Sequence, residues 1–259
     1  MPDGDFAGLL DAAEAIAAQS TGQTMQYFRS TFDVHNKSDA SPVTIADRTT
    51  ETAIRQAISN RYPDHGIMGE EHGAAGLDRE YVWVIDPIDG TKSFISGVPL
   101  FGTLIGVLRH GRPVAGVIHM PGLDETFTGA PGRGARFNGA AIHCRSGVAP
   151  EDAFLCYNEL HKLIRHEPDR AARLLVTGRY QRPTMDCYPY AQLAAGWVDG
   201  VIDYDLDPYD YLPLVGVVQG AGGIITDWDG APLGLRSDGT VAAAASPEIH
   251  AALLSALRD

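Results

Sequence analysis

The sequence is poor in positive charge. Its 259 residues include 20 Lys and Arg against 33 Asp and Glu, which gives a formal net charge of −13 at pH 7. A chain of that charge repels a phosphate backbone, and no run rich in Lys or Arg offers a local exception. Nucleic acid is therefore not expected as a partner. A small phosphate-bearing substrate would need bound cations to offset the carboxylates that meet it.

The sequence also has few cysteines and no long apolar run. Cys144, Cys156 and Cys187 are odd in number and far apart, without a CxxC pair or a disulfide framework. Such usage is typical of the reducing cytoplasm, where we expect the protein to work. No stretch of 18 residues is free of charge and of frequent glycine, so no membrane span is expected. The first ten residues carry Asp3 and Asp5 and no basic segment, which argues against a signal peptide.

The remaining composition is that of an ordinary folded protein. Apolar residues make up 44% of the chain and charged residues 20%, which excludes intrinsic disorder and collagen-like repeats. A length of 259 residues allows one large domain or two small ones, with enough chain to bury a sizeable core.

Helical and strand patterns alternate along the chain. Leu9, Ala13 and Ile16 recur at helical spacing and predict a first helix. A second helix is expected after residues 43–47, with Asp47 or Thr49 as its cap. Pro213 is expected only near the first turn of a helix. The other expected elements are a loop or hairpin region over 61–80, strands over 81–86, 101–108, 113–120, 201–203, 224–226 and 242–245, and helices over 168–178, 189–198, 209–220 and from Ser246 onward.

Two carboxylates three residues apart end a buried strand pattern. Asp86 and Asp89 follow the apolar run 81–85. Ionised carboxylates held close together in a partly buried place repel each other unless a cation lies between them. Oxygen donors without Cys or His nearby favour Mg²⁺ or Mn²⁺ over zinc, and the backbone carbonyl of Ile88 offers a further ligand. The motif therefore indicates a metal site.

The residues that follow favour phosphate as the ligand of that site. Gly90 and Thr91 supply backbone N–H groups that suit phosphate oxygens, especially where a helix begins. The alternative is a solvated surface turn, because Asp, Pro and Gly are also typical of turns. The apolar run in front of the motif and the pair Glu70-Glu71 upstream favour metal chemistry.

The stretch from Trp83 to Thr91 resembles the signature of the inositol monophosphatase family. The resemblance covers residues 37 to 230, through the fragments Val43-Thr44-x-Ala46-Asp47, Gly69-Glu70-Glu71, Asp210 and Gly220-Ala221-Gly222-Gly223. It implies an αβαβα sandwich and a Mg²⁺-dependent phosphomonoesterase, with Mn²⁺ as an alternative ion. Members of this family are usually homodimers and are sensitive to Li⁺.

The resemblance also implies the ligand set of two or three metal ions. Glu70, Asp86 and the Ile88 carbonyl would hold the first ion, and Asp86, Asp89 and Asp210 the second. Glu70 would also contact a third, weaker ion. Lys37 is a candidate for the phosphate or third-metal region, although a lone lysine is more often a solvated surface residue.

Two halves are expected within the layered α/β fold. The first, residues 1–147, would be an α+β half that carries most of the metal ligands. The second, residues 148–259, would be an α/β half that carries the last ligand and the substrate pocket.

The catalytic roles follow from the same resemblance. A water activated by metal would attack phosphorus in line with the leaving oxygen. Two candidates could orient this water and accept its proton, either Glu70 or the pair formed by Thr91 and Asp47. The backbone N–H groups of Gly90 and Thr91 would bind phosphate.

Within the family, the sequence resembles the histidinol-phosphate phosphatase branch. The resemblance is carried by residues 89–105, by Asp186-Cys187-Tyr188 and by the motif from Asp205 to Tyr211. L-Histidinol phosphate carries an ammonium and an imidazole group, which acidic side chains complement. The resemblance implies a role in histidine biosynthesis. The charge of the substrate favours a pocket lined by Asp186, Asp203, Asp205 or Tyr209.

Three other functions stay open on the sequence alone. The inositol branch would hydrolyse inositol 1-phosphate, and a third branch would hydrolyse a nucleotide 3′-phosphate. A catalytically silent binding module on the same scaffold is a fourth reading. Asp203 and Asp207 depart from the residues usual at these positions in the histidinol-phosphate branch.

Overall fold

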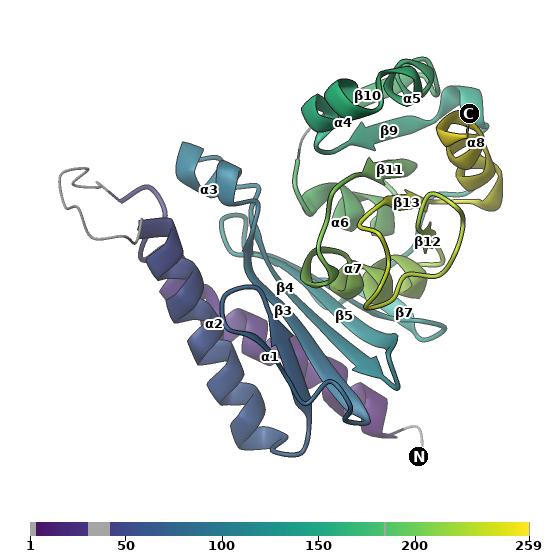
Figure 1. Cartoon of the computed structure of the whole chain (residues 1–259). Helices are drawn as coiled ribbons and strands as arrows, with labels where there is room; N and C mark the ends of the chain where they lie inside the picture. The colour runs from purple at the N-terminus through teal and green to yellow at the C-terminus, as the bar shows by residue number, and fades with distance from the viewer. Residues whose placement is uncertain (1–3, 31–41, 184, 259) are drawn as a thin grey trace.

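The computed structural model describes residues 4–30, 42–183 and 185–258. Lys37 lies outside the described residues. The chain begins with two long helices, α1 (Gly4–Met25) and α2 (Pro42–Arg61), which pack side by side on one face of the first sheet (Figure 1). The apolar positions Leu9, Ala13 and Ile16 of α1 are all buried against this sheet, as their spacing predicts. Helix α2 begins earlier than expected, so Asp47 and Thr49 lie inside it and neither caps it.

The first sheet has eight strands in the order β2-β1-β3-β4-β5-β6-β7-β8. Neighbouring strands are antiparallel except for the parallel pair β1 and β3. The strands are β1 (Gly66–Gly69), β2 (Gly73–Ala75), β3 (Tyr81–Asp89), β4 (Gly102–Arg109), β5 (Arg112–Met120), β6 (Glu125–Ala130), β7 (Gly134–Phe137) and β8 (Ala140–Ile142), and the short helix α3 (Thr91–Ser96) follows β3.

The second sheet has five strands in the order β10-β9-β11-β13-β12. Strand β9 is parallel to β10 and β11, and β13 is antiparallel to β11 and β12. The strands are β9 (Phe154–Tyr157), β10 (Tyr180–Pro183), β11 (Gly200–Asp203), β12 (Ile224–Thr226) and β13 (Val241–Ala244). The other elements of this part are a 3-10 turn (Pro150–Asp152), α4 (Leu160–His166), α5 (Pro168–Leu174), α6 (Tyr188–Ala194), α7 (Pro208–Gly220) and α8 (Pro247–Leu257).

These elements form five layers, α, β, α, β and α. Helices α6 and α7 lie between the two sheets, and their apolar side chains share one core with the inner faces of both sheets. Helices α4, α5 and α8 cover the outer face of the second sheet (Figure 1). The αβαβα fold expected from the sequence is confirmed. The division into halves at residues 147 and 148 remains a prediction.

Helix α7 fits between the sheets because small residues face it. Pro213 lies in its second turn, beyond the first turn where proline is tolerated without cost. Gly106 and Gly116 of the first sheet lie against the backbone of Pro213. The close packing that these glycines allow stabilises a helix in which proline removes one backbone hydrogen bond. None of the described helices is long and apolar enough to cross a membrane.

This close approach gives a test of the fold. We expect Gly116→Ala to lower the free energy of unfolding by about 2 kcal/mol or more, because the added methyl group would lie 2.0 Å from the Pro213 carbonyl oxygen. Gly22→Ala in α1 is the matched control, since a methyl group there meets nothing within 4 Å and alanine favours helix. Urea unfolding of both variants measures the difference. Equal stability of the two variants would contradict the packing described here.

Candidate active site

An irregularity in strand β3 brings its two aspartates to one face of the sheet. Asp86 pairs with Leu104 of β4, and Asp89 pairs with Gly102. Pro87 and Ile88 of β3 thus together oppose the single residue Thr103 of β4, which is a β-bulge. Residues three apart in a regular strand point to opposite faces. The extra residue corrects this, so both carboxylates point to the same side.

The bulge is held by hydrogen bonds at its centre. The hydroxyl of Thr103 donates to the carbonyl of Pro87 at 2.8 Å, and the backbone N–H of Ile88 donates to Oδ1 of Asp86 at 3.0 Å. Asp86 is only 2% exposed. The carbonyl of Ile88 accepts a long hydrogen bond of 3.4 Å from the hydroxyl of Thr91. These contacts fix the backbone that presents the expected carbonyl ligand.

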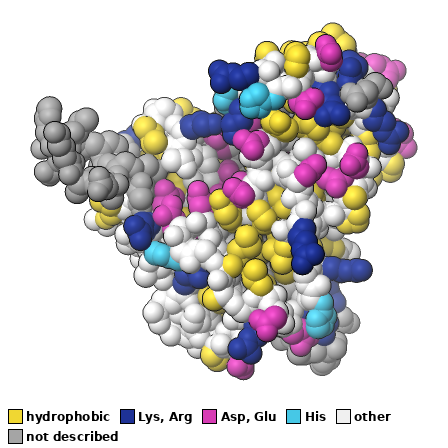
Figure 2. Space-filling view, in the orientation of Figure 1, with side chains coloured by type: hydrophobic (Ala, Val, Ile, Leu, Met, Phe, Trp, Pro, Cys, Tyr) yellow, Lys and Arg dark blue, Asp and Glu magenta, His cyan; other side chains and the backbone are white. Residues whose placement is uncertain are grey.

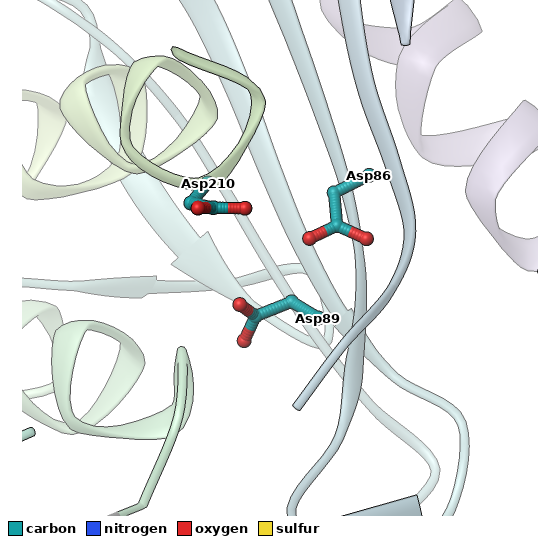
Figure 3. A group of neighbouring side chains, drawn as sticks. All are labelled: Asp86, Asp89 and Asp210. Atoms are coloured by element: carbon teal, nitrogen blue, oxygen red, sulfur yellow. The ribbon is translucent and has the colours of Figure 1, made fainter. Parts of the chain in front are cut away.

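Asp210 joins the two aspartates from the other side of the cleft. It lies in the first turn of α7, where its Oδ2 accepts a hydrogen bond of 2.8 Å from the backbone N–H of Asp207. One carboxylate oxygen from each of Asp86, Asp89 and Asp210 lies within 4.8 Å of the others. Figure 3 shows the three carboxyl groups facing one another, two from the strand and one from the helix.

Glu70 and Asp47 add two further acids. Glu70 follows β1 directly and lines the same cavity as the three aspartates. Asp47 on α2 is 5% exposed, and its buried Oδ1 has no hydrogen-bond partner in the described parts of the chain. No hydrogen bond between Thr91 and Asp47 appears among the described contacts, since the Thr91 hydroxyl turns to Ile88. An acid oxygen buried without a partner is a feature that a bound cation would explain.

Burial and mutual repulsion raise the pKa values of these acids. Burial is the largest cause for each, followed for Glu70 by the charge of Asp210 and for Asp47 by that of Glu70. The pKa of Glu70 rises to about 7, that of Asp47 to about 8 and that of Asp210 to about 6. The pKa of Asp86 rises well above its usual range, by burial first and then by the charge of Asp89. Oxygen donors that repel one another in this way fit a hard divalent cation.

The phosphate side of the site begins at Gly90. Its φ of 86° lies in the left-handed region, and an added Cβ would come within 2.9 Å of the side chain of Asp186. Only glycine fits such a position. The Gly90 carbonyl accepts the N–H of Phe94 at 2.9 Å and so starts helix α3. The chain therefore turns sharply next to the acids, and Gly90 and Thr91 both line the cavity.

One cavity of about 200 Å³ contains most of the predicted site. Figure 2 shows acidic side chains gathered around the hollow between α3 and α4, with basic side chains on the α4 side. Of the predicted residues, those that line the cavity are Glu70, Asp86, Ile88, Asp89, Gly90, Thr91, Asp186, Asp203, Asp205 and Asp210. Asp47 and Tyr209 do not line it.

The four predicted substrate residues differ in their surroundings. Asp186 accepts a hydrogen bond of 2.5 Å from the Ser93 hydroxyl. Asp203 is 3% exposed, and its pKa rises to about 7 because it is buried. Asp205 forms an ion pair of 2.8 Å with Lys162. The Tyr209 hydroxyl donates to Asp207 at 2.9 Å, and neither residue lines the cavity.

The cavity also contains residues that the sequence did not indicate. Glu159 lies between two lysines, with Lys92 at 2.5 Å and Lys162 at 3.3 Å. Asn158 donates to the carboxylate of Asp203 at 2.8 Å. Asn158, Glu159 and Lys162 belong to no recognisable motif, whereas Lys92 lies within the stretch 89–105. The backbone of Glu159 has a positive φ, in the left-handed region, as do the backbones of Asp186 and Asp205 in the same cavity.

Comparisons with known proteins agree with this geometry. Residues 6–259 match the family model of the inositol monophosphatase family. The chain is 42% identical to the chloroplastic bifunctional phosphatase IMPL2 of Arabidopsis thaliana, over 94% of this chain and 73% of that protein. It is 34% identical to a histidinol-phosphatase of Chlorobaculum parvum, over 90% and 91% of the two chains. Its fold matches an inositol monophosphatase structure from Zymomonas mobilis with a TM-score of 0.91 and 35% identity, over 98% of this chain and 99% of the other.

The raised pKa values predict how stability depends on pH and metal. A carboxyl whose pKa is higher in the folded protein than in the unfolded chain stabilises the fold while it is protonated, and this contribution is lost as pH rises through the folded value. With a metal chelator, we expect the melting temperature to fall between pH 6.5 and 8.5, where Glu70 and Asp47 ionise. Excess Mg²⁺ should raise the melting temperature more at pH 8.5 than at pH 6.5.

Thermal unfolding in the four conditions measures this effect. Asp86→Asn is the control, because it removes one of the repelling charges and one metal ligand. Its melting temperature in chelator should depend less on pH and should respond less to Mg²⁺. A wild-type melting temperature in chelator that stays constant or rises between pH 6.5 and 8.5 would contradict the crowding of these acids.

Proposed function

The chain belongs to the inositol monophosphatase family, and we propose that it is the Mg²⁺-dependent member that hydrolyses L-histidinol phosphate to L-histidinol and phosphate. The broader activity, hydrolysis of a phosphoric monoester, is that of the family and of its named relatives. This assignment sets aside the alternative of a catalytically silent module. The family is in general metal-dependent, and the cluster of three aspartates suits a metal ion.

The proposed ligand set uses the acids around the bulge and the start of α7. Glu70, Asp86 and the Ile88 carbonyl would hold one Mg²⁺, and Asp86, Asp89 and Asp210 another, with Glu70 also beside a third. Bound Mg²⁺ lowers the pKa of a coordinated water and offsets the charge of the phosphate. These ions also explain how a chain of net charge −13 accepts an anionic substrate.

The chain's own groups then orient the reaction. The backbone N–H groups of Gly90 and Thr91 would bind phosphate oxygens at the sharp turn after β3. A carboxylate must take the proton of the attacking water. Glu70 lines the cavity, whereas Asp47 does not, and this position supports Glu70 as the proton acceptor over the Thr91 and Asp47 pair.

The other acids that line the cavity carry the substrate proposal. After the metal acids are assigned, Asp186, Asp203, Asp205 and Glu159 still line the same small cavity. A leaving group with an ammonium and an imidazole complements four acids in one small cavity better than a neutral cyclitol does. The histidinol-phosphatase relative that shares 34% identity supports the same choice.

Inositol 1-phosphate is the second candidate. The observation that favours it is the match of the whole fold to the Zymomonas mobilis inositol monophosphatase. A nucleotide 3′-phosphate is a weaker third candidate. A role in histidine biosynthesis follows if histidinol phosphate is the substrate. The homodimer, the inhibition by Li⁺ and the cytoplasmic location stay predictions.

Phosphate release from several substrates tests the proposal. With Mg²⁺ present, we expect kcat/KM for L-histidinol phosphate to exceed that for myo-inositol 1-phosphate and for 3′-phosphoadenosine 5′-phosphate by about tenfold or more. That ratio corresponds to one charge-assisted hydrogen bond. Asp186→Asn should raise KM for L-histidinol phosphate and leave KM for glycerol 2-phosphate, which has no cation, nearly unchanged. A preference for the cyclitol would overturn the substrate proposal and leave the metal chemistry intact.

Replacement of one metal ligand separates activity from folding. We expect Asp86→Asn to reduce Mg²⁺-dependent turnover at least a hundredfold, because metal ions supply several kcal/mol of stabilisation to the transition state. The folded variant should be at least as stable as wild type in chelator, since a repelling charge is gone. Circular dichroism and phosphate release measure the two effects. Retained Mg²⁺-dependent turnover would contradict the assigned ligand set.

A further inference from the structure

Glu51 is a fully buried carboxylate next to the proposed metal site that the mechanism does not use. It lies on α2, one turn after Asp47, and its exposed fraction is 0%. It does not line the cavity. A buried charge is costly unless it is paired and hydrogen-bonded. The hydrogen-bond partners of the Glu51 carboxylate therefore indicate its role.

The contacts of Glu51 reach the residues that directly follow Glu70. Oε2 of Glu51 accepts the backbone N–H of Glu71 at 2.7 Å, and Oε1 accepts the backbone N–H of His72 at 3.3 Å. Arg55, one turn further along α2, donates to Oε1 at 2.6 Å. It also donates to the carbonyl of Gly73, where β2 begins. Helix α2 thus holds the whole turn between β1 and β2.

The same carboxylate also lies against the residue before Glu70. A Cβ added to Gly69 would come within 2.3 Å of Oε1 of Glu51. Only glycine allows this approach without a shift. Glu51 therefore contacts the backbone on both sides of Glu70. Because Gly69 pairs with Ile85 in the parallel pair of β1 and β3, Glu70 comes next to Asp86.

We propose that Glu51 is a positioning residue, which fixes the backbone around Glu70 so that the Glu70 carboxylate meets the same ion as Asp86. The inference rests on the proposed function, in which Glu70 is a metal ligand. Arg55 orients the Glu51 carboxylate and balances its charge. Glu51 itself touches neither the substrate nor the ion.

The chemistry of the contacts explains why a carboxylate is needed at this position. Both Glu51 oxygens accept from N–H donors, two from the backbone and one from the guanidinium of Arg55. A glutamine of the same shape has one oxygen and one amide nitrogen. Its NH₂ group would face an N–H donor, so glutamine would lose the hydrogen bonds that one of the two Glu51 oxygens accepts.

The affinity for metal is the property that this role should change. In Glu51→Gln, we expect the Mg²⁺ concentration that gives half-maximal phosphatase activity to rise about tenfold, as is typical when a group that orients a metal ligand is lost. The activity at saturating Mg²⁺ should stay within about threefold of wild type. Electron paramagnetic resonance of bound Mn²⁺, which needs no substrate, should show the same loss of affinity.

Asp199→Asn is the matched control for a merely structural effect. Asp199 is also a carboxylate of 0% exposure, pairs with an arginine, Arg145, and accepts a backbone N–H, that of Phe154 at 2.8 Å. It does not line the cavity. Its loss should lower the melting temperature and leave the Mg²⁺ and Mn²⁺ midpoints unchanged. Equal shifts of the midpoints in both variants would overturn the proposal.

The remaining outcomes are also decisive. If Glu51→Gln does not fold, Arg55→Gln carries the test, because it removes the group that orients Glu51 and should raise both midpoints about threefold or more. Midpoints equal to those of wild type in the folded variant overturn the positioning role. If wild type hydrolyses no phosphomonoester but binds Mn²⁺, and Glu51→Gln weakens that binding, the proposed function fails and the positioning role stands.

Discussion

Mutual repulsion among acids in one small buried space is the constraint on which the rest of the structure depends. Asp86, Asp89 and Asp210 come within 4.8 Å of one another, and burial raises the pKa values of all three. A fold tolerates such crowding only where each carboxylate is held firmly. The β-bulge holds the two strand residues, and the first turn of α7 holds Asp210. The turn after β1, which Glu51 of α2 holds by hydrogen bonds, positions Glu70.

The site also joins the two sheets. Asp89 on β3 accepts the backbone N–H of Cys187 at 2.7 Å, next to the first residue of α6. Asp210 reaches the same place on α7, whose packing depends on the close approach of Gly116 to Pro213. The glycines that let α7 lie against the first sheet therefore set the distance between the acids. In this molecule the geometry of the site therefore depends on the packing of the core.

The sequence was informative where a motif carries its own chemistry. The spacing of Asp86 and Asp89 after an apolar run predicted a shared site, and the resemblance predicted the sandwich. Yet a regular strand would place these two residues on opposite faces, and the bulge that corrects this depends on pairing with β4, which local sequence does not reveal. Glu159 and Lys162 enter the cavity only through tertiary packing. Helix α2 begins before its expected cap, so Asp47 is an interior residue whose buried oxygen becomes visible only in three dimensions.

The distance along the chain between β3 and α7 has a consequence for how the protein is made. During synthesis, β3 leaves the ribosome with Asp86 and Asp89 long before α7 supplies Asp210. The nascent chain therefore does not yet contain the full repelling cluster. A further part of the electrostatic cost arises when α7 docks between the sheets and brings Asp210 to the other acids. Because β3 is made long before α7, closure of the sandwich completes the acidic cluster only late in synthesis.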